Sequence, residues 1–162
     1  MDRLWSPWRM AYLEAVHTAD DGCFLCRAAD GDRDEDERLH VLSRTDRAFV
    51  VLNAYPYNPG HLMIAVARHV GELEALDTDE MADASGLLQG SIRALKQASD
   101  PDGFNVGLNL GRVAGAGVPG HLHWHVIPRW NGDTNFVTVV GETRVLPELL
   151  ADTYWKLKPV FG

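Results

Sequence analysis

Histidine alternates strictly with an apolar residue in the sequence His-Leu-His-Trp-His-Val, which occupies positions 121–126. A period of two is typical of a half-buried β-strand, in which successive side chains point to opposite faces of the sheet. We therefore expect His121, His123 and His125 on one face, with neighbouring imidazoles about 6.6 Å apart, and the apolar side chains in the core. Three imidazoles at this spacing can reach one phosphate, one metal ion or one another. The pattern thus favours a chemical site over a plain polar surface.

Short apolar runs bounded by turn residues predict further β-strands along the chain. The turn-rich segment Tyr55-Pro-Tyr-Asn-Pro-Gly60 separates two of these runs, which indicates an antiparallel meander. No internal repeat or linker divides the 162 residues. We therefore expect one α+β domain spanning 1–162, with an antiparallel sheet of about five strands and helices packed on it. The expected strands are 39–43, 46–53, 61–67, 104–110 and 121–128.

The longest helical pattern begins at Thr78. Apolar residues recur after it at helical spacing, two acidic residues occupy its first turn, and Pro101 closes it. Shorter helices are expected at 8–16 and 146–157. The charged stretch 30–38 is expected to be a solvated loop or a fraying helix end.

The charge balance limits the classes of partner. Fifteen basic and 23 acidic residues give a net charge of −8, which disfavours a surface that follows a nucleic-acid backbone. A small anionic substrate held by local groups remains compatible with this charge. The sequence contains no apolar run near the ~20 residues that span a bilayer, and its first residues lack the apolar core of a signal peptide. We therefore expect no membrane partner and a cytoplasmic location.

The two cysteines of the chain, Cys23 and Cys26, stand three positions apart. In a reducing compartment this spacing indicates metal ligation or redox chemistry before it indicates a structural disulfide. Zinc prefers four protein ligands in a structural site, so the pair would need two partners from elsewhere in the chain. A reduced, metal-free thiol pair is the alternative.

The histidine row and several flanking motifs together resemble the histidine triad (HIT) superfamily of nucleotide hydrolases and transferases. The resemblance covers about residues 20 to 140 and implies the HIT-like α+β fold. Two flanking segments resemble most the bacterial branch that cleaves diadenosine tetraphosphate; they are 4–10 and 130–136. The motifs that carry the family resemblance follow in the expected order at 53–61, 103–111, 121–127 and 128–130.

The resemblance implies a role for each of three histidines. His123, the middle residue of the row, matches the nucleophile that forms a covalent nucleotidyl-histidine by in-line attack on the α-phosphorus. This role suits a neutral imidazole, which attacks near pH 7 without first losing a proton. His125 and His61 match residues that contact phosphate oxygens or orient the attacking ring. For either of these two residues, a histidine satisfied within the core is the alternative.

The resemblance also implies substrate contacts outside the histidines. Asn53 matches a residue that binds ribose hydroxyls, and Asn109 matches another substrate contact, although both could instead bond within a turn. Family members commonly place a hydroxyl or glutamine side chain just before the histidine row, whereas this chain has small or apolar residues there. Phosphate contacts would then fall to backbone amides, with Arg112 and Arg129 as the nearby cations. The loop positions concerned are Gly115, Ala116, Gly117 and Val118.

Zinc-bearing members of the superfamily complete a two-cysteine site with two histidines. The matching positions here are His69 and His121, which with Cys23 and Cys26 would form a closed structural zinc site. A metal-bound His121 could not pass a proton to the leaving group, so the leaving nucleotide would depart as an anion or take a proton from water.

The first functional interpretation is therefore a nucleotidyl-transferring enzyme that splits a dinucleoside polyphosphate, with phosphate or water as the second acceptor. A metal-dependent hydrolase or lyase is a second class, since His-x-His on a strand also builds open three-histidine zinc sites. A non-catalytic nucleotide sensor is a third. The resemblance further implies a homodimer, and the substrate could arrive as a magnesium complex.

Overall fold

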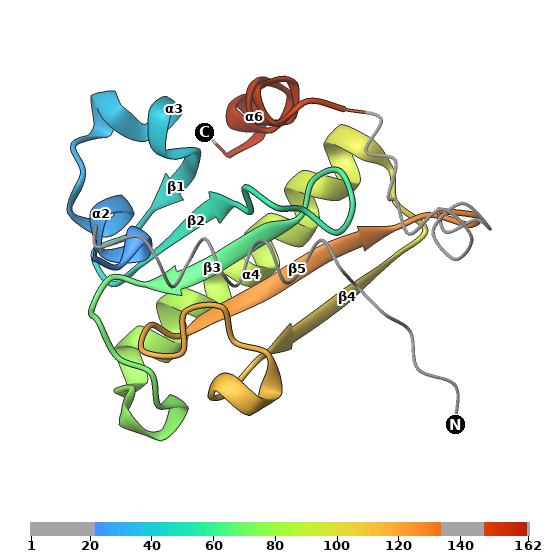
Figure 1. Ribbon diagram of the computed structural model, residues 1–162. Coiled ribbons are helices and arrows are strands. Elements are labelled where there is room, and N and C mark those ends of the chain that lie inside the picture. Colours follow the sequence, from blue (N-terminus) through green and yellow to red (C-terminus); the bar gives the residue numbers. More distant parts are fainter. Residues whose placement is uncertain (1–21, 134–147, 162) are drawn as a thin grey trace, which may run out of the picture.

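A computed structural model describes residues 22–133 and 148–161 of the chain. Within them, five strands form one antiparallel sheet in the order β1-β2-β3-β5-β4 (Figure 1). The predicted α+β architecture and its opening meander are confirmed. The strands are β1 (Val41–Arg44), β2 (Ala48–Leu52), β3 (Leu62–Val66), β4 (Gly103–Leu108) and β5 (His123–Arg129). The helices are α2 (Phe24–Asp30), α3 (Asp36–Leu39), α4 (Thr78–Ser99) and α6 (Leu150–Leu157), with short 3-10 turns η1 (Arg33–Glu35), η2 (Leu73–Ala75), η3 (Arg112–Ala114) and η4 (Lys158–Val160).

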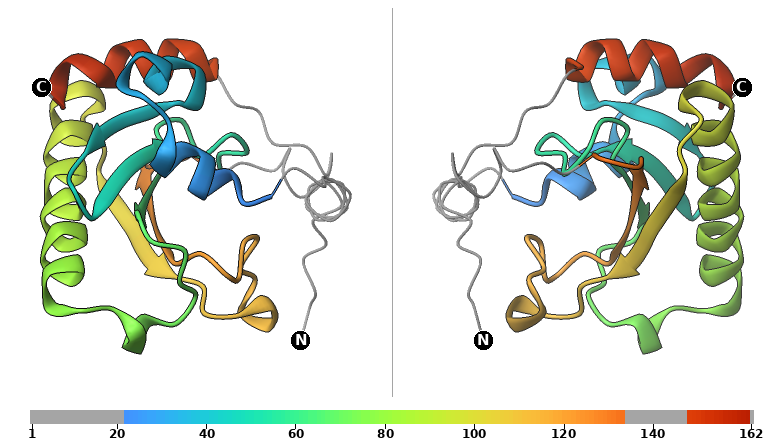
Figure 2. Two further views of the ribbon diagram at one scale, coloured as in Figure 1. Left: turned by 90° about the vertical axis from the view of Figure 1, so that its left-hand side faces the viewer. Right: turned by 90° about the vertical axis from the view of Figure 1, so that its right-hand side faces the viewer.

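Helices cover the sheet on both faces, and each face has its own core. Figure 2 shows α4 running along one face and α2 lying on the other. The α4 face buries Leu62, Ile64 and Val126 together with residues of α4 and α6. The α2 face buries Leu25 and Met63 with neighbours from β1 and β2. β2 and β3 are therefore buried on both faces, which explains their continuous apolar runs.

The long helix α4 begins where the sequence predicts it. Asp77 accepts a hydrogen bond from the Glu80 amide, and the Glu80 carboxylate accepts one from the Asp77 amide, forming a capping box. Arg68 donates two hydrogen bonds to the same Glu80 carboxylate, at 2.8 and 2.9 Å. These bonds, led by those from Arg68, lower the pKa of Glu80 to about 2. The bonds from Arg68 hold the start of α4 against the loop after β3.

The structure differs from two of the expectations in part. β5 begins at His123 rather than at residue 121, so the first histidine of the row lies outside the strand. The charged stretch 30–38 is not merely a solvated surface, because it forms η1 and the start of α3 and buries Asp36. That carboxylate accepts hydrogen bonds from Arg44 at 2.8 Å and from Lys158 at 3.4 Å.

Some predicted segments fall outside the described residues. These are the expected helix 8–16, the motif 4–10 and the last three residues of the motif 130–136. The last helix begins at Leu150, and the first two residues predicted for it also lie outside the described part. Among the helices that the structure describes, none is long and apolar enough to cross a membrane.

Candidate active site and metal centre

The histidines gather on the α2 face of the sheet. His123 and His125 stand opposite Ala65 and Met63 of β3 in the strand register, and directly opposed residues share a face. His61, just before β3, brings its Nε2 atom to 3.0 Å from the Nδ1 atom of His125. The predicted row therefore contributes two imidazoles to this cluster, and the third comes from the turn before β3.

Hydrogen bonds fix which nitrogen of each ring carries the proton. The Tyr57 amide donates to His61 Nδ1 at 3.1 Å, so the proton of a neutral His61 ring is on Nε2. His61 Nε2 then donates to His125 Nδ1, which places the His125 proton on its own Nε2. The Tyr57 ring stacks on His61 with centroids 5.1 Å apart. The turn 53–60 thus sets the orientation of both imidazoles.

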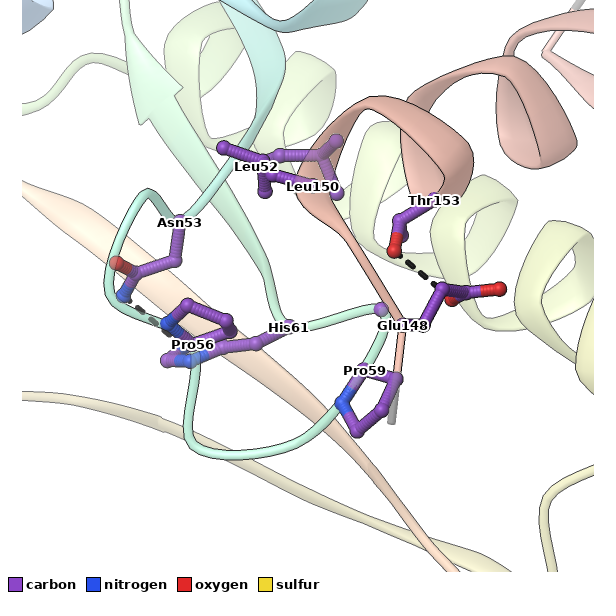
Figure 3. A pocket seen from close by; sticks show the side chains of 9 residues that line it. Leu52, Asn53, Pro56, Pro59, His61, Glu148, Leu150 and Thr153 are labelled. Carbon is purple, nitrogen blue, oxygen red and sulfur yellow. Dashed lines mark hydrogen bonds between the residues drawn. The ribbon is translucent and has the colours of Figure 1, made fainter. Parts of the chain in front are cut away.

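The surroundings of His61 explain why it is fully buried. Figure 3 shows its ring beside Asn53 and next to a small cavity that Thr153 and Glu148 also line. The Asn53 amide nitrogen lies 3.5 Å from His61 Nε2, and its oxygen accepts a hydrogen bond from the Tyr55 amide at 2.9 Å. Asn53 therefore lies next to the histidine cluster, as its predicted role requires, and also closes the local turn.

His123 is buried, and a hydrogen bond determines which of its ring nitrogens carries the proton. Its Nδ1 atom lies 2.8 Å from the backbone oxygen of His121, which can only accept, so Nδ1 carries the proton and Nε2 carries the lone pair. Burial lowers the pKa of His123 below its ordinary value, against a smaller opposite effect of this hydrogen bond. The residue is therefore a neutral imidazole near pH 7 with a defined nucleophilic nitrogen.

His121 is oriented away from the other two histidines of the row. Its Nε2 atom donates to the backbone oxygen of Val66 at 2.7 Å, which leaves the Nδ1 lone pair directed at the cysteines. Nδ1 lies 3.4 Å from Cys23 Sγ and 3.5 Å from Cys26 Sγ. Burial is the main cause of a lowered His121 pKa, which also favours the neutral ring that binds metals.

The four predicted metal ligands lie together. One ligand atom from each of Cys23, Cys26, His69 and His121 falls within 4.8 Å of all the others, and Cys26 Sγ lies 3.1 Å from His69 Nδ1. A tetrahedral ion with ordinary zinc distances separates sulfur from nitrogen by about 3.6 Å, close to the separations found here. Without a cation, burial and the neighbouring Cys23 raise the pKa of the Cys26 thiol to about 11. The cluster is therefore suited to a metal ion.

The glycine-rich loop is less open to phosphate than predicted. The amides of Gly115 and Ala116 donate within the loop, to the carbonyls of Arg112 at 3.0 Å and Gly111 at 3.3 Å. Among the described residues, the amides of Gly117 and Val118 make no such backbone hydrogen bond. The Asn109 side chain reaches the Gly115 carbonyl at 3.5 Å and so borders the same loop.

Two features of the site escaped the sequence analysis. The sequence predicts only a turn at Tyr57, but the Tyr57 amide and ring position His61. The sequence predicts Arg129 as a cation near the phosphates, but its guanidinium is paired with Asp133. The Asp133 carboxylate also accepts a hydrogen bond from the buried Asn58 at 2.8 Å. This group ties the turn before His61 to the end of β5. The sequence offered no periodic signal for contacts between residues so far apart.

A family model for the HIT domain matches residues 35–132, more than half of the chain. The chain belongs to the HIT family. A relative from Mycobacterium tuberculosis, named AP-4-A phosphorylase, is 45% identical over 157 residues, which cover 94% of this HIT chain and 80% of the relative. The bacterial branch indicated by the sequence motifs is thereby confirmed.

Solved structures of HIT proteins share the fold. A zinc-bound histidine triad protein from Mycobacterium smegmatis has a TM-score of 0.67 at 23% identity and covers 86% of this chain and 93% of its own. A histidine triad nucleotide-binding protein from Sulfolobus tokodaii has a TM-score of 0.63 at 25% identity, covering 86% of this chain and 89% of its own.

Proposed function

We propose that this HIT chain is a nucleotidyl-transferring enzyme that splits a dinucleoside polyphosphate such as diadenosine tetraphosphate through a covalent intermediate on His123. The observation that carries the proposal is the tautomer of His123. Its Nδ1–H donates a hydrogen bond to the His121 carbonyl, which leaves Nε2 as the nucleophile. The relative named AP-4-A phosphorylase supports the substrate class.

In the first step, the Nε2 lone pair of His123 attacks the α-phosphorus. A nitrogen–phosphorus bond forms, and the bond to the bridging oxygen breaks with its electron pair leaving on the departing nucleotide. The positive charge that develops on the His123 ring is stabilised by the His121 carbonyl at Nδ1. His125 donates its Nε2 proton in a hydrogen bond to a phosphate oxygen, and His61 keeps His125 in that tautomer.

The leaving nucleotide departs as an anion or takes its proton from water. His121 cannot supply a proton, because its Nε2 proton is bound to the Val66 carbonyl and its Nδ1 faces the cysteines. In the second step, an oxygen of phosphate or water attacks the adenylyl group, the nitrogen–phosphorus bond breaks, and its electron pair returns to His123 Nε2.

The metal in the Cys23, Cys26, His69 and His121 cluster is proposed to be zinc. Two thiolates and two imidazoles suit this ion, and a four-ligand site is closed and structural. Zinc would supply no step of the reaction there. It would fix α2 and the segment before β5 to each other.

We propose that phosphate is the second acceptor. The nucleotide products of the reaction test this proposal. Diadenosine tetraphosphate in saturating phosphate should yield ADP and ATP in equal amounts, because phosphate takes the adenylyl group from His123. The nucleotides can be separated by ion-exchange chromatography, with a phosphate-free reaction as the control. AMP as the main partner of ATP would contradict the phosphorylase assignment and indicate a hydrolase. No cleavage in either buffer would contradict the enzymatic function and favour the nucleotide sensor.

The three-histidine metallohydrolase is disfavoured by the orientation of the row. Among the described residues, the metal-ligand cluster includes His121 but neither His123 nor His125. The homodimer, the cytoplasmic location, the single-domain organisation and a magnesium complex of the substrate stay predictions.

A further inference from the structure

A second polar surface adjoins the histidine cluster on the side away from Asn53. A groove with a volume of about 380 Å³ lies over β4 and β5, and His125 and Gly107 both line it. These two residues are direct partners in the strand register, so they share a face of the sheet. β4 is the edge strand and has no buried residue. The groove is therefore open to a ligand that reaches beyond His125.

The chemistry of the groove suits a nucleoside better than a phosphate. No lysine or arginine is among the described residues that line the groove. Arg129, which bonds to Asn105 at its edge, is neutralised by a two-bond pair with Asp133. Arg129 also donates to Asn105 Oδ1 at 2.7 Å, which fixes the orientation of that amide. The NH₂ group of Asn105 is then the part of the amide that can donate a hydrogen bond to a ligand. Tyr57 and Ile127 add aromatic and apolar surface to the lining. A base can stack on such a surface and accept a hydrogen bond from an amide.

The position of the groove indicates which nucleoside it would hold. The strand order places β2, which ends beside Asn53, on one side of β5 and places β4 on the other. His61 and His125 lie between Asn53 and the groove. A substrate with its transferred ribose at Asn53 would therefore extend its polyphosphate past the histidines and bring its other end to β4.

We propose that this groove binds the nucleoside of the leaving nucleotide, so that the enzyme selects substrates that carry a nucleoside at both ends. The inference rests on the proposed function, because the leaving nucleotide is defined by attack at His123. It adds a specificity-determining surface formed by Asn105, Gly107 and Tyr57 to the reaction.

The test compares diadenosine tetraphosphate with the methyl ester of adenosine tetraphosphate. Both carry the same phosphate chain, the same charge and the same transferred adenosine, but the ester has no second nucleoside. Wild-type enzyme should have a kcat/KM at least about tenfold higher for the dinucleotide, since stacking of one base is worth that much. The readout is the ratio of the two kcat/KM values, so a general loss of activity leaves it unchanged.

Two variants locate the effect in the groove. A Cβ atom at Gly107 meets nothing within 4 Å, so Gly107→Leu fills the groove without a backbone clash and should bring the ratio close to one. Asn105→Asp keeps the acceptor for Arg129, removes the amide donor and should lower the ratio severalfold. Gly103→Leu is the matched control, because Gly103 shares the strand and the face, also has open space, and does not line the groove.

The outcomes separate this inference from the proposed function. An active wild-type enzyme whose ratio is within twofold of one would overturn the nucleoside subsite and leave the reaction at His123 intact. Equal losses on both substrates in Gly107→Leu and Asn105→Asp would also overturn it, because the groove would then serve the transferred half. Absence of turnover with either substrate in the wild type would instead contradict the proposed function itself.

Discussion

His123→Asn is expected to lower turnover of diadenosine tetraphosphate by at least about 10³-fold while nucleotide affinity changes only a few fold. The asparagine amide is close in size to the imidazole and can still donate to the His121 carbonyl, as His123 Nδ1 does at 2.8 Å. It offers no nucleophilic nitrogen, so only the covalent step should be lost. Steady-state rates and calorimetric binding of the substrate measure the two quantities.

The same substitution elsewhere provides the control for this prediction. His40 adopts the left-handed conformation with φ of 57°, which asparagine tolerates well, and it lies outside the histidine cluster. His40→Asn should keep activity within about twofold of wild type. If His123→Asn kept more than about a tenth of wild-type turnover, a barrier difference of only ~1.4 kcal/mol, His123 would not be the nucleophile.

Loss of the metal should destabilise the protein more than it slows the reaction. Purified protein should contain about one zinc per chain, and Cys26→Ser should abolish metal binding and lower the free energy of unfolding by more than about 3 kcal/mol. The physical reason is that the cluster joins α2, the loop after β3 and the segment before β5, so losing the metal removes a link among three separate segments. Elemental analysis and urea denaturation measure both effects.

Chelation separates a structural metal from a catalytic one. Turnover should survive brief treatment with a chelator, whereas the thermal midpoint should fall as metal is removed, and His40→Asn should retain its metal. Wild-type protein without zinc would refute the metal assignment. A rate that fell in parallel with metal content in the still folded protein would instead revive the metallohydrolase interpretation.

Periodic sequence patterns predicted the strand that carries the histidines and the long helix α4. The alternation of His123 and His125 with Trp124 predicted β5 and the shared face of these two histidines, and the acidic first turn after Thr78 located α4. The family resemblance added what no pattern contains, namely that His69 and His121 lie with the cysteine pair, and the structure brings these four residues together.

The sequence patterns did not predict contacts between side chains that are far apart along the chain. Asp36 belongs to a charged stretch, yet Arg44 and Lys158 hold it in a buried position. The bond between Asn58 and Asp133 spans 75 positions and leaves no periodic trace. His121 lies outside β5, although the alternation predicted it within the strand. Its ring bonds to the Val66 carbonyl and the cysteines, and these tertiary contacts outweigh the alternating pattern.

The stereochemical course at phosphorus tests the covalent route most directly, because it does not depend on the intermediate accumulating. Diadenosine tetraphosphate made chiral at the α-phosphorus with sulfur and an oxygen isotope would be cleaved by the wild-type enzyme, and the configuration of the adenylyl product determined. Each in-line displacement inverts the phosphorus, so attack by His123 followed by attack of the acceptor predicts overall retention. Inversion would mean a single displacement by phosphate or water and would contradict a nucleotidyl-His123 intermediate.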